Sequence, residues 1–495
     1  MRIAPVLGVI GRLLQIFCVA FLPPLALATW DYYFHAAPAA EILEFSGALV
    51  LTWCSGWLLA RFFVKEPDFR RAEALAIVSG TWLVIAHFAA IPYLFSGLGY
   101  VDSFFESMSG LTTTGATILQ DFGAHGRAFF LWRSMTQWFG GLGVIALFVV
   151  VLPQLGIAGR QILFAEGSDA TTDVISPSVR ESARRLWQLY GFLTILEMGM
   201  LFFLGNMGIY DACCHALTTM SAGGFSPNPA SIAGYNSASV EWIITGFMIL
   251  SGMSFPLIWV GFTRRPKEFL RDGEFRFYIV CILLAAGGLS FLLAGGMPSM
   301  EDVRISLFQT TSLISSTGFA SVDYAQAPWT DGMRVLLLFV MLVGGCAGSA
   351  AGGPKAVRIL LSLKFMWREF TRVLHPRGVI PLRHRGRAVP NDAMRAILNL
   401  VLVFGVLELV VGAMMVLLNP GMDLISGFTS ALACIGNIGP GFEAVGPMEN
   451  FAALHPLSKI ILTLGMWMGR LELLTVLVLL HPDVLRNLHW RGRRS

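Results

Sequence analysis

Charged residues are scarce in this chain. Only 13% of its 495 residues are Asp, Glu, Lys or Arg, whereas 55% are hydrophobic, and a soluble domain carries about 25% charged residues. This balance excludes an ordinary soluble domain. The chain instead contains many apolar runs of roughly 20 residues, the length that spans a bilayer as a helix. Because lipid offers no partners to backbone polar groups, we expect these runs to be helices of a polytopic membrane protein.

Patterns that indicate catalysis or a bound cofactor are also lacking. The seven cysteines show no metal-ligand spacing, so we interpret them as small hydrophobic residues rather than a metal site or a disulfide set. The GGLG at 140–143 lies in an apolar run without a preceding strand, which argues against a nucleotide site. No cluster of His, Asp or Cys lies at bilayer depth. We therefore expect neither a membrane-embedded enzyme nor a bound organic cofactor.

What the chain does contain is a short glycine loop that occurs four times. Each loop ends a brief semi-polar stretch between two long apolar runs, and one such loop would indicate no more than a turn. Four in the same context predict a quasi-four-fold structure around an axis, and the natural object on such an axis is a pore. The loops are SGLTTTGAT (109–117), LTTMSAGGFS (217–226), SLISSTGFAS (312–321) and CIGNIGPGF (434–442).

The hydropathy pattern predicts an all-α fold of five parts. An N-terminal two-helix hairpin precedes four pseudo-repeats of helix, pore loop and helix around one central pore. The predicted bounds are 1–71 for the hairpin, then 72–156, 180–263, 274–364 and 391–483 for the pore repeats.

Lysine and arginine predict how the chain is oriented in the membrane. Basic clusters lie between the repeats, at 61–71, 180–185 and 264–271, with the densest run at 364–395 and an RGRR tail at 491–494. Segments after the glycine loops are almost free of Lys and Arg. The positive-inside rule therefore places the connectors and both termini in the cytoplasm, with the glycine loops opening outward. We interpret the basic runs as topology signals or docking surfaces and not as nucleic-acid sites.

The stretches before the glycines are too short to span a bilayer and carry acids near their starts. An acid complements the positive end of a helix dipole, so the negative ends should point inward and favour a cation. Glycine permits positive φ, which lets successive carbonyls face an axis and replace the hydration shell of an ion. The expected filter glycines are Gly115, Gly223, Gly318 and Gly439. The expected carbonyl donors to K⁺ are Thr113, Thr114, Ser221, Ala222, Ser316, Thr317, Asn437 and Ile438.

With these motifs the chain resembles the Trk/Ktr/HKT superfamily of potassium-uptake proteins, most closely the bacterial TrkH/TrkG branch. The resemblance implies potassium uptake across a bacterial inner membrane, a homodimer, and a cytosolic ring of regulatory subunits that bind NAD or ATP/ADP. The matching segments are TTTGAT (112–117), WRSMTQWFGGLGVIAL (132–147), SAGGFS (221–226), SSTGF (315–319), GGCAGSAAGGPKAVRILLSLK (344–364), GNIGPG (436–441) and GRLELLTVLVL (469–479).

Two intramembrane features predict a gate. The small-residue run 344–353 interrupts an apolar helix, which lipid tolerates only where the break faces protein or water. The resemblance implies a flexible loop under the filter, and close helix packing is the alternative. Arg470 lies inside the last apolar helix, where a charge is expensive and suggests function. We expect Arg470 to contact the loop and to oppose cation flow. The expected gating glycines are Gly344, Gly345, Gly348, Gly352 and Gly353.

Some alternatives stay open at this point. A sodium-preferring or poorly selective transporter of the same superfamily is the second hypothesis, and Gly115 argues against it because relatives with serine at this position favour sodium. Transport that is channel-like or coupled to protons or sodium is not distinguished by the residues. Four further polar residues lie in the predicted helices, and we interpret them as hydrogen-bonded structural groups rather than proton relays: Glu106, His215, Glu197 and Glu408.

Overall fold

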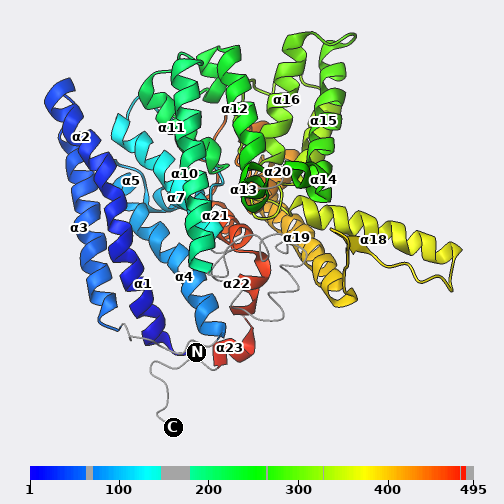
Figure 1. The fold of residues 1–495 in the computed structure, drawn as a ribbon. Coiled ribbons are helices and arrows are strands. Elements are labelled where there is room, and N and C mark those ends of the chain that lie inside the picture. Colours follow the sequence, from blue (N-terminus) through cyan, green and yellow to red (C-terminus); the bar gives the residue numbers. More distant parts are fainter. Residues whose placement is uncertain (63–70, 147–178, 264–265, 327, 480, 487–495) are drawn as a thin grey trace.

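The computed structural model describes residues 1–62, 71–146, 179–263, 266–326, 328–479 and 481–486 (Figure 1). In this part of the chain the fold is almost entirely helical. Six helices are long and apolar enough to cross a membrane, or seven if one bent pair counts as a single span. The all-α membrane fold is therefore confirmed. The expected repeat end at 147–156 and the basic residues at 63–70, 264–265 and 487–495 lie outside the described residues.

The N-terminal hairpin forms as predicted and lies along one side of the molecule (Figure 1). Its first arm comprises α1 (Ile3–Phe17), a 3-10 turn η1 (Cys18–Phe21) and α2 (Leu22–His35), and its second arm is α3 (Ala40–Ala60). Glycines allow α1 and α3 to touch, since a Cβ on Gly11 would lie 2.4 Å from the backbone nitrogen of Ala60. The Phe21 ring stacks on Trp132, with ring centroids 4.5 Å apart, and attaches the hairpin to the pore units.

Four units follow, each with a long helix, a short half-helix and a second helix. Unit one contains α4 (Arg71–Ala89), α5 (Ile91–Phe95), α6 (Tyr100–Leu111) and α7 (Arg127–Ala146). Unit two contains α10 (Val179–Phe203), α11 (Ile209–Met220), η4 (Ser231–Tyr235), α12 (Ala238–Ser251) and α13 (Phe255–Thr263). Unit three contains α15 (Gly273–Ala294), α16 (Met300–Ile314), α17 (Asp331–Met341) and α18 (Ala356–Leu374). Unit four contains α19 (Asn391–Leu418), α20 (Leu424–Ile435), η5 (Glu443–Val445), α21 (Pro456–Arg470) and α22 (Leu473–Leu479).

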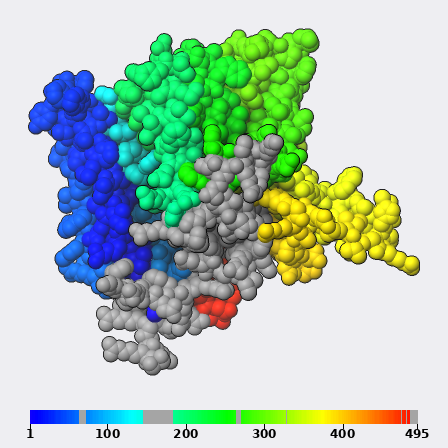
Figure 2. Space-filling view, viewed as in Figure 1, coloured from blue at the N-terminus to red at the C-terminus, as the bar shows by residue number. Residues whose placement is uncertain are grey.

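Short elements lie on the expected cytoplasmic side. Helix α14 (Pro266–Arg271) joins units two and three, a hairpin of β1 (Arg383–His384) and β2 (Arg387–Ala388) joins units three and four, and α23 (Pro482–Arg486) follows unit four. The hairpin lies between α18 and α19 in the chain. Helix α18 projects from the rest of the described chain (Figure 2).

The half-helices α6, α11, α16 and α20 have 12, 12, 15 and 12 residues, so none is long enough to span a bilayer. Acids lie at their starts as predicted. Ser299 and Asp302 form a capping box on α16, and the Asp423 side chain accepts a hydrogen bond from the Ser426 N–H on α20. Asp102 and Asp211 lie in the first turns of α6 and α11. Each half-helix thus carries an acid at its positive end.

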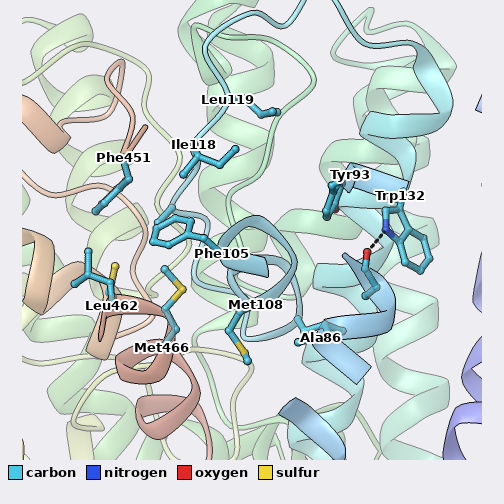
Figure 3. Packing of buried hydrophobic residues seen from close by; sticks show 14 of the residues in the cluster. Ala86, Tyr93, Phe105, Met108, Ile118, Leu119, Trp132, Phe451, Leu462 and Met466 are labelled. Atoms are coloured by element: carbon cyan, nitrogen blue, oxygen red, sulfur yellow. Dashed lines mark hydrogen bonds between the residues drawn. The ribbon is translucent and has the colours of Figure 1, made fainter. Parts of the chain in front are cut away.

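Each half-helix is buried by its neighbours, as α6 illustrates (Figure 3). Phe105 and Met108 of α6 are fully buried and pack in one cluster with Leu462 and Met466 of α21. Burying a side chain of this size stabilises the fold by about 1.5–3 kcal/mol. Helix α21 belongs to unit four, whereas α6 belongs to unit one. The contact therefore joins the last unit to the first.

The second helices of units two and four are broken, whereas the predicted pattern of helix, pore loop and helix has one second helix in each unit. Helices α12 and α13 meet at an angle of 102° across a short break. Helix α21 ends at Arg470, and Glu472 then takes φ 65° before α22 begins. The sequence S-G-M-S-F-P at 251–256 explains the first break, because Pro256 lacks the N–H that a continuous helix requires. The predicted break in unit three is present but longer, since α17 ends at Met341 and α18 begins at Ala356.

Candidate functional site

The four half-helices end with the same backbone motif. The second residue after each helix takes a left-handed conformation, and its N–H bonds to the carbonyl three residues earlier at 2.9–3.3 Å. The next N–H bonds to the carbonyl five residues earlier at 2.8–2.9 Å, which completes a Schellman motif. None of the left-handed residues is glycine, so each holds strain of about 1–3 kcal/mol. They are Thr113, Ala222, Ser316 and Asn437, with φ of 52°, 55°, 53° and 51°.

A glycine with positive φ follows two residues after each left-handed residue. These glycines are Gly115, Gly224, Gly318 and Gly439, with φ of 83°, 78°, 82° and 102°. The sequence alignment of the second loop was therefore wrong by one residue. Gly224, and not Gly223, is equivalent to the other three, and the residues before it are Ala222 and Gly223 rather than Ser221 and Ala222. The sequence alone allowed either of the two adjacent glycines to be aligned. The end of helix α11 shows that Gly224 is the equivalent one.

The four loops touch one another in a closed ring. A Cβ on Gly115 would lie 2.2 Å from the carbonyl oxygen of Gly223 in the next loop. The same contact occurs at each of the other three boundaries, and the last loop returns to the first. The other pairs are Gly224 with the Thr317 oxygen at 1.9 Å, Gly318 with the Ile438 oxygen at 2.2 Å, and Gly439 with the Thr114 oxygen at 2.6 Å. No side chain fits at any of the four glycines, because each is packed against a neighbouring carbonyl.

Polar contacts reinforce the same four boundaries on the outer side. Each contact joins a charged residue on the second helix of one unit to the half-helix or loop of the next unit. The contacts are Arg133 Nη1 to the Ser226 oxygen at 3.2 Å, Arg304 Nε to Glu241 at 2.9 Å, the Arg334–Glu443 ion pair, and Lys459 Nζ to Asp102 at 2.6 Å.

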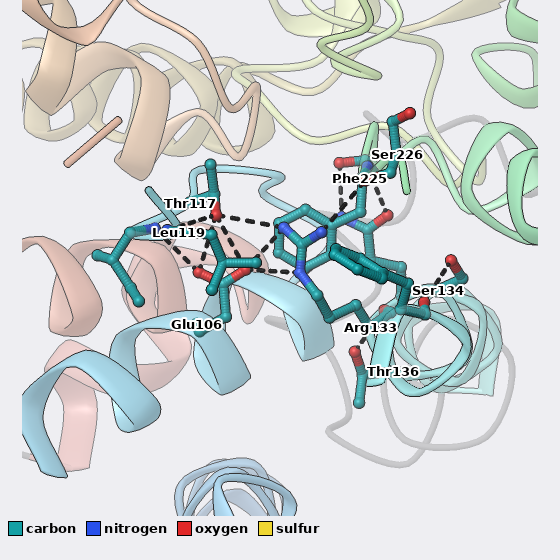
Figure 4. Close-up of polar contacts among 12 residues, drawn as sticks. Glu106, Thr117, Leu119, Arg133, Ser134, Thr136, Phe225 and Ser226 are labelled. Atoms are coloured by element: carbon teal, nitrogen blue, oxygen red, sulfur yellow. Dashed lines mark hydrogen bonds and ion pairs between the residues drawn. The ribbon is translucent and has the colours of Figure 1, made fainter. Parts of the chain in front are cut away.

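A buried ion pair supports the first loop (Figure 4). Arg133 lies 2.7 Å from Glu106, and their side chains are 2% and 0% exposed. Glu106 also accepts hydrogen bonds from the Thr117 hydroxyl at 3.1 Å and the Ile118 N–H at 3.0 Å. The Arg133 guanidinium lies 4.0 Å from the centre of the Phe225 ring, in the second loop. The interpretation of Glu106 as a hydrogen-bonded group is thus confirmed. The Glu106–Arg133 ion pair contacts both the first and the second loop and fixes their relative position.

Gln137 clamps the second loop and was not singled out from the sequence. Its side-chain nitrogen donates to the Gly223 carbonyl at 2.6 Å, and its oxygen accepts from the Phe225 N–H at 3.0 Å. His215 supports the same loop, since its ring nitrogens contact the Asp211 carbonyl at 2.7 Å and the Ser226 hydroxyl at 3.1 Å. The structural interpretation of His215 is confirmed. The motif WRSMTQW contained the signal for Gln137. Gln137 lies four residues after Arg133, so the two side chains lie on the same face of the helix.

The contacts of Glu197 are weaker. Both carboxylate oxygens are buried, and the Thr219 hydroxyl is the polar group that faces them among the described residues. Glu408 is similar, because its Oε1 atom is buried without a hydrogen bond in that part of the chain. Sequence alone gave no information on the neighbours of either residue.

An outer cavity lies against the ring. It has a volume of about 60 Å³, and all four glycines with positive φ line it. Thr117, Arg133 and Glu449 contribute polar groups to the same cavity. A hydrated ion that reaches this cavity would meet the carbonyls and backbone of the four loops.

The loop between α17 and α18 lies against the inner side of the ring. The Gly352 N–H donates to the Ser316 hydroxyl at 2.5 Å, and a Cβ on Gly352 would lie 2.4 Å from the Gly436 oxygen. The loop therefore touches the third and fourth glycine loops directly. Gly344, Gly348 and Gly353 take φ of 74–77°, a conformation that strains other residues. Gly345 is needed for space, since a Cβ there would lie 2.4 Å from the Ala351 side chain.

Arg470 contacts this loop, as the sequence led us to expect. Its Nη1 donates to the Ala350 carbonyl at 2.8 Å, and the residue is 5% exposed. Its Nε and Nη2 atoms are buried without a hydrogen bond among the described residues. Arg470 lines a cavity of about 20 Å³ together with Lys355 and Arg358. Arg358 pairs with Glu472 at 2.6 Å, which explains how the acid two residues beyond Arg470 is satisfied.

The break in unit two holds the other side of the loop. The Cys346 N–H donates to the Gly252 carbonyl at 2.8 Å, and the Phe255 N–H donates to the Gly348 carbonyl at 3.0 Å. A third bond joins the Ala350 N–H to the Ser251 carbonyl at 3.2 Å. These contacts were not predicted, although the small residues and Pro256 at the break were the available signal. The loop is thus bound to units two, three and four.

Comparisons with known proteins agree with this architecture. Residues 45–483 match the family model TrkH, described as a cation transport protein. The chain is 33% identical to the Trk system potassium uptake protein TrkH of Vibrio parahaemolyticus, over 98% of this chain and 100% of that one. It is 31% identical to the Trk system potassium uptake protein TrkG of Escherichia coli K12, over 95% and 96%. The crystal structure of the potassium transporter TrkH from Vibrio parahaemolyticus superposes with a TM-score of 0.87 at 30% identity, covering 98% of this chain and 100% of that one.

Proposed function

The chain belongs to the TrkH family of cation transport proteins, and on this premise we propose that it is the ion-conducting subunit of a bacterial potassium uptake system. The observation that carries the proposal is the closed ring of four loops, each with the same backbone motif and each packed against the carbonyl of the next. Such a ring can present several carbonyl oxygens to one cation. Its relatives in Vibrio parahaemolyticus and Escherichia coli are named as potassium uptake proteins, which supports potassium as the transported ion.

The filter works through backbone oxygens in this proposal. The aligned positions carry Thr114, Gly223, Thr317 and Ile438, whose side chains have little in common. Only the carbonyl is shared by all four, so side-chain coordination cannot be equivalent in the four units. Carbonyls that replace the hydration shell can favour K⁺ over Na⁺. A sodium-preferring or poorly selective transporter is the alternative, and Gly115 weighs against it.

The inner loop and Arg470 form the gate in this proposal. The loop lies against two filter segments, and Arg470 places a positive charge beside it. At an effective dielectric constant near 20, a charge within a few ångströms opposes a cation by a few kcal/mol. Opening would move the loop and change the position of this charge relative to the ion path.

Regulation would come from the cytosol. Relatives are named as parts of a Trk system, which supports a partner protein. We propose a homodimer in the inner membrane, with both termini cytoplasmic, on which a ring of nucleotide-binding subunits docks at the basic run 364–395. The described part of that run includes α18 and the β1–β2 hairpin, both on the expected cytoplasmic side.

Flux in liposomes tests the proposed function. Purified protein should carry Rb⁺ and K⁺ into vesicles faster than Na⁺, and a proton gradient applied separately would reveal coupling. Equal rates for K⁺ and Na⁺ would favour the poorly selective alternative. Vesicles that show no protein-dependent cation flux, with folded protein incorporated, would contradict the proposal.

A further inference from the structure

A buried carboxylate at the start of α15 holds the middle of the gating loop. Glu274 is 1% exposed, and its Oε1 atom accepts a hydrogen bond from the Ala347 N–H at 2.6 Å. Hydrogen bonds to an ionised acceptor are roughly twice as strong as those between neutral groups. Glu274 is the second residue of α15, so a helix on the cytoplasmic side of unit three is attached directly to the gate.

The other oxygen of the same carboxylate faces the β1–β2 hairpin. Arg385, at the hairpin turn, places Nη2 3.8 Å from Glu274 Oε2 and Nε 2.7 Å from Asp272 Oδ2. Asp272 in turn caps α15, because its side chain accepts from the Phe275 N–H at 2.9 Å. One arginine of the hairpin therefore faces two acids that fix the start of α15, and one of these acids touches the gate.

Apolar packing joins the hairpin to the gate a second time. Leu382, next to the first strand, is buried in a cluster that contains Ala347 of the gating loop. The turn itself is tightly defined, with Arg385 at φ 49° and Gly386 at φ 79°, as a two-residue hairpin requires. The other members of the cluster are Val357, Leu361, Met394 and Ile397, from α18 and α19. A displacement of the hairpin would disturb the charged contact and the apolar contact together.

We propose that Glu274 is a positioning residue of the gate, and that a cytosolic partner acts on the gate by moving the hairpin that carries Arg385. With Arg385 in place, the carboxylate is oriented and its bond to the Ala347 N–H holds the loop against the filter. When the hairpin moves away, the buried carboxylate loses the cation that faces it and rotates toward water, which releases Ala347. This inference rests on the proposed function of the loop as a gate, and it names the residues that connect the gate to the cytosol.

The chain offers an internal reporter of the loop. Cys346 precedes Ala347 and is 1% exposed, so its thiol should react slowly while the loop is closed. The experiment uses full-length protein in liposomes with the other six cysteines replaced by alanine. A membrane-impermeant thiol reagent is added on the cytosolic side, and both the rate of Cys346 modification and the Rb⁺ flux are measured.

Four variants are compared in this background: Glu274→Gln, Arg385→Gln, the double variant, and Arg383→Gln as the control. Arg383 is exposed on the same hairpin, and the control makes the same change of charge as Arg385→Gln. We expect each of the first two to raise the modification rate and the flux by about fivefold to 150-fold, the range of coupling between linked sites. The double variant should exceed neither single variant, because both remove one connection. Arg383→Gln should match the parent protein.

Several results would overturn the inference. If Glu274→Gln and Arg385→Gln leave both rates at the parent value, the carboxylate does not position the gate. If their effects multiply in the double variant, the two residues act independently. Thermal unfolding of each variant identifies any variant that does not fold. If Glu274→Gln does not fold, Arg385→Gln alone tests the inference, because it leaves the buried Glu274 side chain unchanged. A parent protein that conducts no Rb⁺ contradicts the proposed function instead, while the Cys346 rates still report whether Glu274 holds the loop.

Discussion

Four loops with different sequences, on the proposed outer side of the ion path, adopt one backbone conformation. On the proposed inner side, three second helices break in three different ways. The outer loops share the Schellman motif, the glycine at positive φ and the contact with the next carbonyl. The inner breaks comprise a bend of 102° in unit two, a loop from 342 to 355 in unit three, and a single left-handed Glu472 in unit four.

The difference fits the roles proposed for the two regions, selection by the four loops and gating at the breaks. Selecting an ion requires equivalent oxygens around it, and only a repeated backbone supplies these when the side chains differ. Controlling the path requires one element with two positions, and a four-fold repeat of that element would serve no purpose. Substitutions in the outer region should therefore reduce selectivity or stability, whereas substitutions in the inner region should increase flux.

The largest effect is expected for Gly224→Ala. The new Cβ would lie 1.9 Å from the Thr317 oxygen, and φ 78° strains any residue except glycine. Strain of about 1–3 kcal/mol, increased by the overlap, should reduce selective Rb⁺ flux by at least tenfold. Gly246→Ala is the control, because nothing lies within 4 Å of a Cβ on that helical glycine. If the two variants show the same Rb⁺ flux and the same K⁺ to Na⁺ ratio, Gly224 is not part of the filter.

The next effect concerns the ion pair behind the first loop. Glu106→Gln leaves the Arg133 charge buried without its carboxylate, which typically costs about 3–5 kcal/mol. We expect a clear fall in the thermal midpoint in detergent and a loss of K⁺ over Na⁺ preference. Glu301→Gln provides the comparison, since Glu301 is 69% exposed in its pair with Arg304 and should change stability by less than about 1 kcal/mol. Similar midpoints for both variants would contradict the supporting role of Glu106.

A smaller effect of opposite sign is expected at Arg470. Arg470→Ala removes the charge and the bond to the Ala350 carbonyl, so cation flux should rise about tenfold if the barrier falls by about 1.4 kcal/mol. Arg470→Lys keeps the charge and should raise flux less. The two variants separate the electrostatic barrier from the attachment of the loop. Wild-type flux in both would make Arg470 a structural charge.

The smallest effect is expected for Gly348→Ala. The position has φ 74°, but the nearest atom to a new Cβ is the Ser254 hydroxyl oxygen at 3.4 Å. Only backbone strain of about 1–3 kcal/mol acts here, and the loop can relieve part of it by moving. Basal Rb⁺ flux should rise about twofold without a change in the K⁺ to Na⁺ ratio. A changed ratio would show that the inner loop and the filter are not separate regions.

Several features could be read from the sequence because they depend on local chemistry. Hydropathy and length gave the membrane helices, short acid-headed stretches gave the half-helices, and a glycine-rich run gave the break in unit three. Gly224 was missed because adjacent glycines can both be aligned, and only the end of α11 decides between them. Gln137, Glu274 and Arg385 were missed because their partners lie 73 to 111 residues away or belong to another unit, and no local pattern encodes such contacts.

The most direct test of the account locates the ion itself. Crystals grown or soaked in a rubidium salt should show an anomalous peak on the axis of the four-loop ring, enclosed by carbonyls that include those of Thr114, Gly223, Thr317 and Ile438. The Gly224→Ala variant should lose this peak. A peak bound instead by side chains outside the four loops, or a well-ordered ring without any peak, would contradict the claim that the ring is the filter.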